Sequence, residues 1–149
     1  MKLYIACDHR GTSMKDYLIK ELEPTYNIIP SAIQNSSEDD YPDFAFDIAT
    51  EMDKENDLGI LICGTGVGIS IAANKVQGIR CARVNNIDDA ISSRQHNHAN
   101  IIALPAYLSN EEALKIIEAF LNTDPSMEER HLRRINKIIS YEKAAYNEL

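Results

Sequence analysis

Residues 58–75 read LGILICGTGVGISIAANK, an apolar run followed by a glycine-rich turn and a second segment of small and apolar residues. The first part, which ends at Cys63, has the length and continuous hydrophobicity of a buried strand. Three of the chain's six glycines, Gly64, Gly66 and Gly68, fall within the next five residues and indicate a close approach of backbone to a ligand. A strand, a glycine turn and a helix start together predict an anion site, because free N–H groups and the helix dipole favour negative charge there.

Strands and helices alternate along the whole chain. We expect strands at residues 3–7, 26–29, 58–63, 78–84 and 101–104. We expect helices at residues 12–22, 44–52, after the glycines to 75, 88–94, 110–121 and 127–147. This alternation predicts an α/β fold of three α/β/α layers, Rossmann-like, around a mostly parallel five-stranded sheet. The chain of 149 residues shows no linker or repeat, so we expect one domain, residues 1–149.

The last expected helix, residues 127–147, is long and mostly polar, with apolar positions at Ile135, Ile138 and Ile139. Little of the sheet is left for it to cover. We therefore expect these apolar positions to pack on a second subunit, and the protein to be a homodimer or a larger homo-oligomer.

The charge balance and the cysteines exclude several classes of protein. Lys plus Arg number 15 against 23 Asp plus Glu, a formal net charge of −8. This argues against a general nucleic-acid binder, although a local arginine cluster can still bind a small phosphate. The three cysteines form no CxxC pair, which indicates a reducing compartment. No apolar run is long enough for a signal peptide or a membrane span, so we expect a cytoplasmic protein without a membrane partner.

The glycine turn has two other interpretations. A tight strand-to-helix turn needs glycines even without a ligand. A dinucleotide site places its glycines after the first strand and an acidic residue at the end of the next strand. Here the glycines follow the third strand, and the next strand ends in Asn85-Asn86. This pattern argues against a nicotinamide cofactor.

Cys63 lies between the expected strand and the glycine turn, which opens two interpretations. Buried cysteines usually behave as small hydrophobic residues, as expected for Cys7 and Cys81. Lowering a thiol pKa from about 8.5 to about 7 needs roughly 2 kcal/mol of differential stabilisation. A helix N-terminus gives about 0.3–1 kcal/mol, and up to about 2 kcal/mol when partly buried. The dipole together with a few loop N–H donors would supply this stabilisation, so the residues alone leave both interpretations of Cys63 open.

His9 and His96 are each expected in a loop at the carboxyl end of a strand, where both would face the glycine turn. A solvated loop histidine is the alternative. A zinc site built from these histidines with Asp8 and Cys63 is not favoured, because no two of the four residues have compact metal-ligand spacing. We therefore expect no metal.

Arg130 and Arg134 are four residues apart, so they share one face of the last helix. Two adjacent guanidinium forks are suited to a phosphate dianion. A solvated surface pair is the alternative, and the spacing alone leaves both open.

Several segments together resemble the B-type ribose-5-phosphate isomerases, a family that includes the subunits of galactose-6-phosphate isomerase. The segments are Cys7-Asp8-His9, Asp40-Tyr41-Pro42, residues 59–75, Ser93-Arg94-Gln95-His96-Asn97 and Arg130-His131-x-x-Arg134. The resemblance runs from residue 1 to about residue 139 with the motifs in the same order, and the long central motif is the most specific.

The resemblance implies an aldose–ketose isomerase without metal or cofactor. It would interconvert ribose 5-phosphate and ribulose 5-phosphate, in the pentose phosphate pathway, through a cis-enediolate. Cys63 would be the base that moves the proton between C1 and C2, Thr65 would assist at the sugar oxygens, and His96 would open the furanose ring as an acid. The implied substrate-binding residues are Asp8, His9, Tyr41, Gly64, Gly66, Val67, Gly68, Asn97, Arg130 and Arg134.

Within this set, the resemblance implies a division of labour. The backbone N–H groups of residues 64–68 would hold the enediolate oxygen, and His9 with the two arginines would hold the phosphate. Asp8 would contact the ring end and Asn97 a sugar hydroxyl. Family members are dimers or tetramers with sites built from two subunits, and the resemblance implies the same here.

The sequence departs from the family pattern at Pro30-Ser31-Ala32, at Arg10 and at Tyr107. Many members carry Asp-x-Gly at the first position, an uncharged residue at the second and a substrate-contacting arginine at the third. These departures leave a six-carbon aldose phosphate open as the substrate, such as allose 6-phosphate or galactose 6-phosphate.

A non-catalytic phosphosugar-binding module is a further alternative. Cys63, Thr65 and His96 occur together in this chain. A module that only binds has no use for such a set of base and acid, so the combination favours an enzyme.

Overall fold

The computed structural model describes residues 1–147, and residues 148–149 at the end of the expected domain lie outside this range. Five parallel strands form one sheet in the order β2-β1-β3-β5-β4. The strands are β1 (Lys2–Cys7), β2 (Asn27–Pro30), β3 (Leu58–Cys63), β4 (Cys81–Arg83) and β5 (Ile101–Pro105). The predicted five-stranded sheet is confirmed, and all of its strand pairs are parallel.

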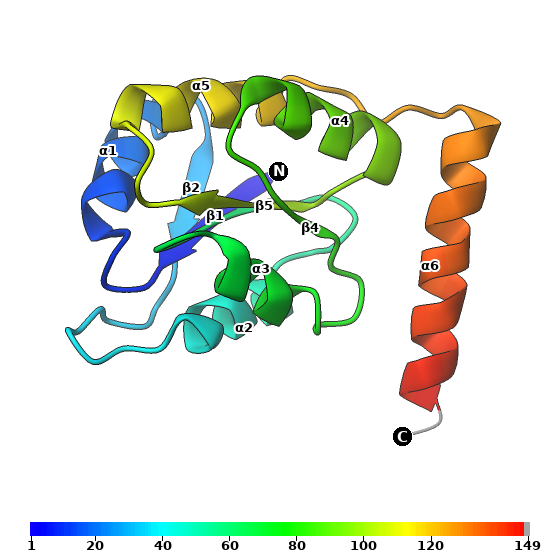
Figure 1. Cartoon of the computed structure of the whole chain (residues 1–149), viewed down its shortest axis with the longest axis horizontal. Helices are drawn as coiled ribbons and strands as arrows, with labels where there is room; N and C mark the ends of the chain where they lie inside the picture. The colour runs from blue at the N-terminus through cyan, green and yellow to red at the C-terminus, as the bar shows by residue number, and fades with distance from the viewer. Residues whose placement is uncertain (148–149) are drawn as a thin grey trace.

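Helices cover both faces of the sheet, as predicted for a three-layer α/β/α fold (Figure 1). One face packs against α1 (Thr12–Leu22), α4 (Ile87–Asn97) and α5 (Asn110–Leu121), and the other against α2 (Tyr41–Glu51) and α3 (Val67–Ala73). Each face buries its own apolar cluster, with Ile62 on the first and Cys63 on the second. The alternation of strand side chains therefore turns Cys63 toward the face that α3 covers.

The strand order creates a switch point between β1 and β3. From β1 the chain passes to β2 on one side, and α2 then returns it to β3 on the other side of β1. The ends of β1 and β3 lie side by side, since Cys7 pairs with Ile62 and the N–H of Asp8 bonds to the Ile62 carbonyl oxygen at 3.2 Å. Open α/β sheets bind their ligands outside the carboxyl ends of strands at such a point.

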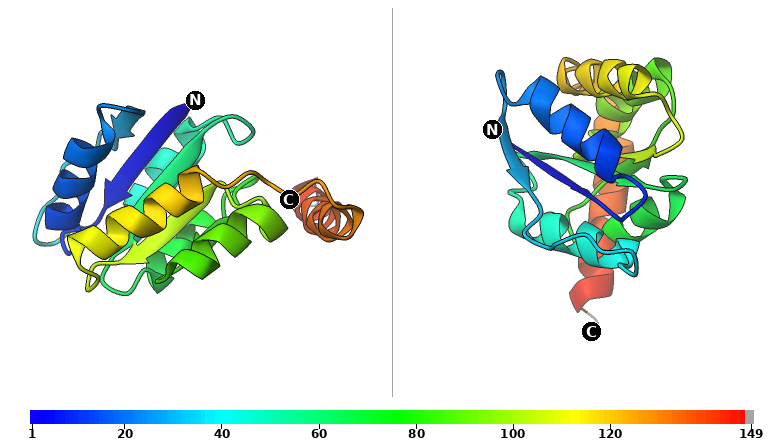
Figure 2. Two further views of the ribbon diagram at one scale, coloured as in Figure 1. Left: turned by 90° about the horizontal axis from the view of Figure 1, so that it is seen from above. Right: turned by 90° about the vertical axis from the view of Figure 1, so that its left-hand side faces the viewer.

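Helix α6 (Glu129–Asn147) stands apart from the two helix layers in Figures 1 and 2. Two hydrogen bonds connect α6 to the segment that follows α3. The Gly78 N–H donates to Glu142 Oε1 at 2.8 Å, and the Tyr146 hydroxyl donates to the Lys75 carbonyl oxygen. None of the helices within residues 1–147 is both long enough and apolar enough to cross a membrane.

Helix α4 is longer than predicted and corrects the expected place of His96. It continues to Asn97 instead of ending at Arg94, so His96 lies in a helix and not in a loop. His98 ends the helix in a left-handed conformation, at φ 48°, with its N–H bonded to the Arg94 carbonyl oxygen at 3.2 Å.

Candidate active site

The carboxyl-edge cluster comprises the residues at the ends of β1 and β3, together with the tyrosine that packs on them. Its members are Asp8, His9, Tyr41, Cys63 and the glycine loop of residues 64–68. Cys63 is the last residue of β3 and is 4% exposed, whereas Asp8 directly follows β1 and is 6% exposed. Both are presented by buried strands, which gives them fixed positions relative to each other.

The glycine loop offers a row of unused hydrogen-bond donors. Among residues 1–147, the amide N–H groups of Gly64, Thr65, Gly66 and Gly68 donate to no protein acceptor, and the Val67 N–H bonds weakly to Thr65 Oγ1 at 3.3 Å. Gly66 has φ 77°, and a Cβ on it would lie 2.9 Å from the Leu104 carbonyl carbon. Several free N–H groups in a glycine loop at a helix start are an anion-binding arrangement.

Tyr41 lies against this loop. A Cβ on Gly68 would come within 2.6 Å of the Tyr41 ring, so glycine at this position allows the first turn of α3 to contact the ring. Tyr41 is the first residue of α2 and is 40% exposed. The structure therefore brings this predicted site residue to the glycine loop.

His9 is held by Asp39, a residue that sequence reasoning missed. The His9 N–H and ring Nδ1 both meet Asp39 Oδ1, at 2.9 and 2.7 Å, and Asn35 Nδ2 and the Ser36 N–H donate to Asp39 Oδ2 at 3.0 Å each. Burial alone would raise the pKa of Asp39, but the hydrogen bonds from Asn35, His9 and Ser36 outweigh it and hold the pKa at about 2. The ionised Asp39 fixes the His9 ring and leaves its Nε2 to a ligand.

The other two thiols lie in less reactive surroundings. Cys7 ends β1 but points into the cluster beneath α1, α4 and α5, where burial raises its pKa to about 12. Burial also raises the pKa of Cys81 to about 12, against a lowering hydrogen bond from Ser70. Both therefore remain protonated thiols at neutral pH. Of the three cysteines, Cys63 is the one that directly precedes the glycine loop.

The remaining predicted site residues form a second group with His131, a residue of the same motif. This amino-edge cluster is defined as His96, Asn97, Arg130, His131 and Arg134. A helix between two parallel strands returns the chain to the amino edge of the sheet. The end of α4 therefore lies near the start of β5, and α5 likewise delivers the start of α6 to this edge. The rings of His96 and His131 stack with centroids 4.6 Å apart and planes at 10°.

The expectation that His96 faces the glycine loop is therefore wrong. Five residues of β5, Ile101–Pro105, separate the two edges by about 13 Å, at roughly 3.3 Å per residue. Hydrogen-bond reach is about 3 Å, so His96 and Cys63 of one chain do not act on the same atoms. For the same reason the four residues considered above for a zinc site, Asp8, His9, Cys63 and His96, do not come together in one chain. Within residues 1–147 there is also no other group of three or more His, Cys, Asp or Glu side chains that could hold a metal ion.

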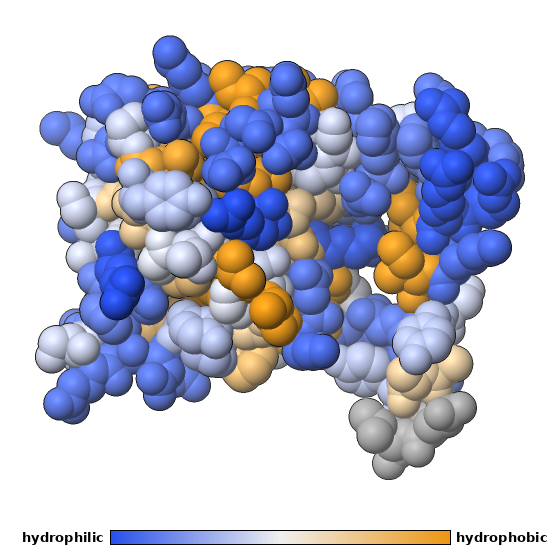
Figure 3. Space-filling model, viewed as in Figure 1, coloured by the Kyte–Doolittle hydropathy of each residue, from blue (hydrophilic) through white to orange (hydrophobic). Residues whose placement is uncertain are grey.

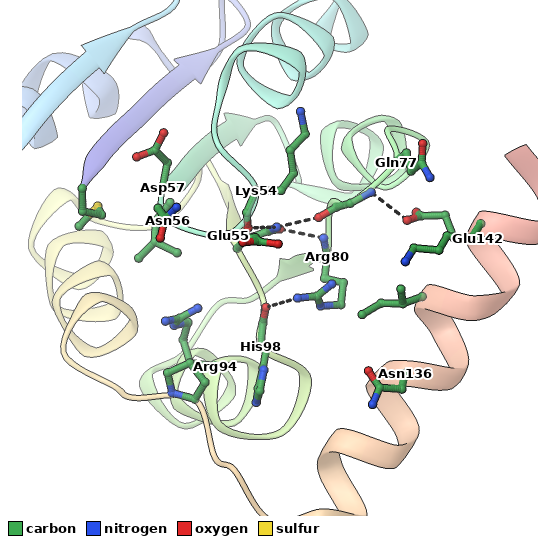
Figure 4. A pocket seen from close by; sticks show the side chains of 17 residues that line it. Lys54, Glu55, Asn56, Asp57, Gln77, Arg80, Arg94, His98, Asn136 and Glu142 are labelled. Atoms are coloured by element: carbon green, nitrogen blue, oxygen red, sulfur yellow. Dashed lines mark hydrogen bonds between the residues drawn. The ribbon is translucent and has the colours of Figure 1, made fainter.

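Arg80 holds the end of α4 in place, beside a cavity of ≈ 700 Å³ between the body and α6 (Figure 4). Its Nε donates to the Asn97 carbonyl oxygen at 2.9 Å and its Nη2 to the His98 carbonyl oxygen at 3.2 Å. These two bonds occupy carbonyl groups that the helix end leaves without partners. Arg80 therefore positions His96 and Asn97, a role that no sequence motif indicated.

The arginines of α6 differ in their partners. Arg130 pairs with Glu128, and Arg133 pairs with Glu129 at 2.8 Å. Within the described chain, Arg134 pairs with no carboxylate. Desolvation, with Arg130 and His96 nearby, lowers the pKa of His131. Arg134 is thus an exposed guanidinium without a carboxylate partner in residues 1–147, which suits an anion.

These features define a Rossmann-like α/β enzyme with a thiol and an anion-binding loop at its switch point. The chain belongs to the Ribose/Galactose Isomerase family, whose model matches residues 3–138. A probable ribose-5-phosphate isomerase B of Mycoplasma genitalium is 42% identical over 95% of both chains. The ribose-5-phosphate isomerase B of Mycobacterium tuberculosis is 37% identical over 96% of this chain and 91% of its own.

Solved structures agree with the sequence comparison. The Mycoplasma genitalium ribose-5-phosphate isomerase B with bound ribulose-5-phosphate superposes with a TM-score of 0.88, at 42% identity over 95% of this chain and 96% of that chain. The Clostridium thermocellum ribose-5-phosphate isomerase B superposes with a TM-score of 0.90, at 40% identity over 97% and 99%. The family and the fold predicted from the sequence are confirmed.

Proposed function

We propose that this protein interconverts ribose 5-phosphate and ribulose 5-phosphate through a cis-enediolate, without a metal or cofactor, in the pentose phosphate pathway. The chain is a sugar-phosphate aldose–ketose isomerase by its family and its relatives. The observation that carries the mechanism is the row of free N–H groups on Gly64, Thr65, Gly66 and Gly68, in the loop that directly follows Cys63. A base next to preorganised oxyanion donors is what proton abstraction alpha to a carbonyl requires.

In the proposed reaction, the Cys63 thiolate takes the proton from C2 of the open-chain aldose. The electron pair moves into the C1–C2 bond, and the C1 carbonyl oxygen becomes the enediolate oxygen held by the loop N–H groups. Thr65 assists the transfer of the O2 proton to O1, and the Cys63 thiol returns its proton to C1 to give the ketose. A single preorganised donor contributes about 3 kcal/mol to such a step, so several make a large contribution.

The other predicted residues bind and open the sugar in this proposal. Arg130, Arg134 and His9 take the phosphate, because charge-assisted hydrogen bonds favour a dianion. His96 donates the proton that opens the furanose ring, with Asp8 at the ring end and Asn97 on a hydroxyl. Tyr41 contacts the substrate from its place over the glycine loop.

We propose that the complete site needs two copies of the chain, in a homodimer or tetramer. The two clusters lie on opposite edges of one sheet, so a second copy is the source of an amino-edge cluster that can face Cys63. Apolar surface suits such an interface: Val67 and Ile71 on α3 are 47% and 57% exposed, and Ile138 on α6 is 52% exposed. Figure 3 shows hydrophobic surface over α3 and on the side of α6 that faces the body.

The proposal extends to the whole chain and its location. We propose that residues 1–149 act as one isomerase domain in the cytoplasm, where the free thiols of Cys7, Cys63 and Cys81 would stay reduced. Cell fractionation with a thiol-labelling reagent tests the location.

The decisive assay is formation of ribulose 5-phosphate from ribose 5-phosphate by purified protein in the presence of EDTA. Turnover supports the metal-free isomerase. Turnover of six-carbon aldose phosphates in place of ribose 5-phosphate would move the specificity to those sugars. Binding without turnover of any sugar phosphate would instead establish a binding module.

A further inference from the structure

Arg83, the last residue of β4, reaches the glycine loop although the proposed mechanism does not use it. Its Nε donates to the Thr65 carbonyl oxygen at 2.9 Å, and its Nη2 donates to the Tyr107 hydroxyl at 2.9 Å. In the sheet, β5 lies between β4 and β3, so the side chain spans a strand to make the first bond. Tyr107 follows β5 and is 64% exposed.

The bond to Thr65 fixes one peptide plane of the loop. A trans peptide is planar, so its C=O and N–H point in opposite directions. Because Arg83 holds the Thr65 C=O, it also sets the direction of the Gly66 N–H on the other side of the same peptide. This N–H donates to no acceptor within residues 1–147, and Gly66 itself has the backbone freedom of a glycine at φ 77°. Within residues 1–147 the Thr65 carbonyl oxygen accepts no backbone hydrogen bond, so the bond from Arg83 is what fixes the orientation of this peptide.

The guanidinium also changes the strength of the donor. A charged N–H donor withdraws electron density from the carbonyl oxygen that accepts it, and chains of hydrogen bonds polarise one another. The Gly66 N–H therefore becomes a better donor to a developing oxyanion. The Tyr107 hydroxyl keeps the guanidinium in position by accepting its second hydrogen bond.

We propose that Arg83 is a positioning residue for the isomerase reaction, acting through the Thr65–Gly66 peptide on the oxyanion donor of Gly66, with Tyr107 as its support. The inference rests on the proposed function of the glycine loop. Arg83 stabilises the enediolate more than the bound sugar in this account, so it raises kcat and leaves KM nearly unchanged.

The test compares Arg83→Leu, Arg83→Lys and Tyr107→Phe with the wild-type protein. Removing a whole oxyanion donor costs about 10²–10³ in kcat, so we expect loss of its orientation in Arg83→Leu to cost about tenfold, with KM within about twofold. Arg83→Lys restores part of this loss because it keeps a charged donor. Tyr107→Phe gives a smaller fall in kcat.

Binding of an enediolate analogue supplies a second readout. A phosphorylated hydroxamate has the planar anionic oxygens of a cis-enediolate, so its affinity falls with kcat in Arg83→Leu, while the affinity for the product is unchanged. Wild-type kcat in Arg83→Leu, or equal losses of affinity for analogue and product, would overturn the proposal. Turnover of ribose 5-phosphate by the wild-type protein in the same assay would show that the proposed function holds even where the proposal for Arg83 fails.

Discussion

The carboxyl-edge cluster is preformed within one chain, whereas the amino-edge cluster is presented outward. Cys63 and Asp8 end or follow buried strands and are nearly inaccessible, and the glycine loop beside them is locked by tight packing. His96 is exposed at the end of α4, and Arg134 is exposed on α6, which stands apart from the body. The contrast teaches that the proposed base and His9 are fixed by the fold of one chain, while the place of the two arginines proposed for the phosphate depends on what α6 meets in the assembly.

The largest expected effect is at the carboxyl edge. Cys63→Ala removes the proposed base, so kcat falls by about 10²–10⁴ while KM stays close to its wild-type value. Steady-state kinetics with ribose 5-phosphate measure both. Cys81→Ala is the matched control and keeps its turnover, because Cys81 lies away from the loop with a raised pKa. Ordinary turnover of Cys63→Ala would remove Cys63 from the mechanism.

A smaller effect, of a different kind, is expected at the amino edge. Arg134→Ala loses a charge-assisted hydrogen bond to phosphate, worth about 1.5–3 kcal/mol, so KM rises by roughly 10- to 100-fold with kcat less affected. Arg133→Ala is the control, since Arg133 pairs with Glu129 on the same helix. If both variants had the wild-type KM, Arg134 would be ordinary helix surface.

The smallest effect is expected for Asp39, whose carboxylate holds the His9 ring in place within one chain. The folded pKa of Asp39 is about 2 against an ordinary 3.8, so its ionised form stabilises the fold above about pH 4, and this contribution disappears as the pH falls to about 2. Asp39→Asn therefore unfolds more easily at pH 7 by about 1–2 kcal/mol, and the difference from wild type closes in acid. Urea unfolding at several pH values measures this, with the neighbouring Glu38→Gln as control. A difference in unfolding free energy between Asp39→Asn and wild type that persisted at pH 2 would contradict the attribution of this stability to the ionised Asp39.

The sequence was sufficient for the sheet, its helix layers and the loop at residues 64–68, because each depends on local hydrophobic runs and on glycines close together. The place of His96 was mispredicted because Gln95-His96-Asn97 reads as a polar loop, whereas tertiary contacts of Arg80 and His98 continue the helix. The topology alone would have corrected this error, since a crossover helix ends at the amino edge.

Asp39 and Arg83 could not be found in the same way. Asp39 meets His9 from 30 residues away, and Arg83 meets Thr65 across an intervening strand that follows both in the chain. No periodicity or spacing encodes such contacts. They depend on which loops the finished sheet brings together.

The central claim is that the carboxyl-edge cluster of one chain works with the amino-edge cluster of another. The most direct measurement unfolds and refolds Cys63→Ala together with a His96→Ala/Arg134→Ala double variant, each nearly inactive alone. A mixed dimer then holds one site with every residue intact, so an equal mixture is expected to recover about a quarter of wild-type turnover. Activity no greater than the sum of the two separate variants would contradict the claim, because it would mean that each chain completes its own site.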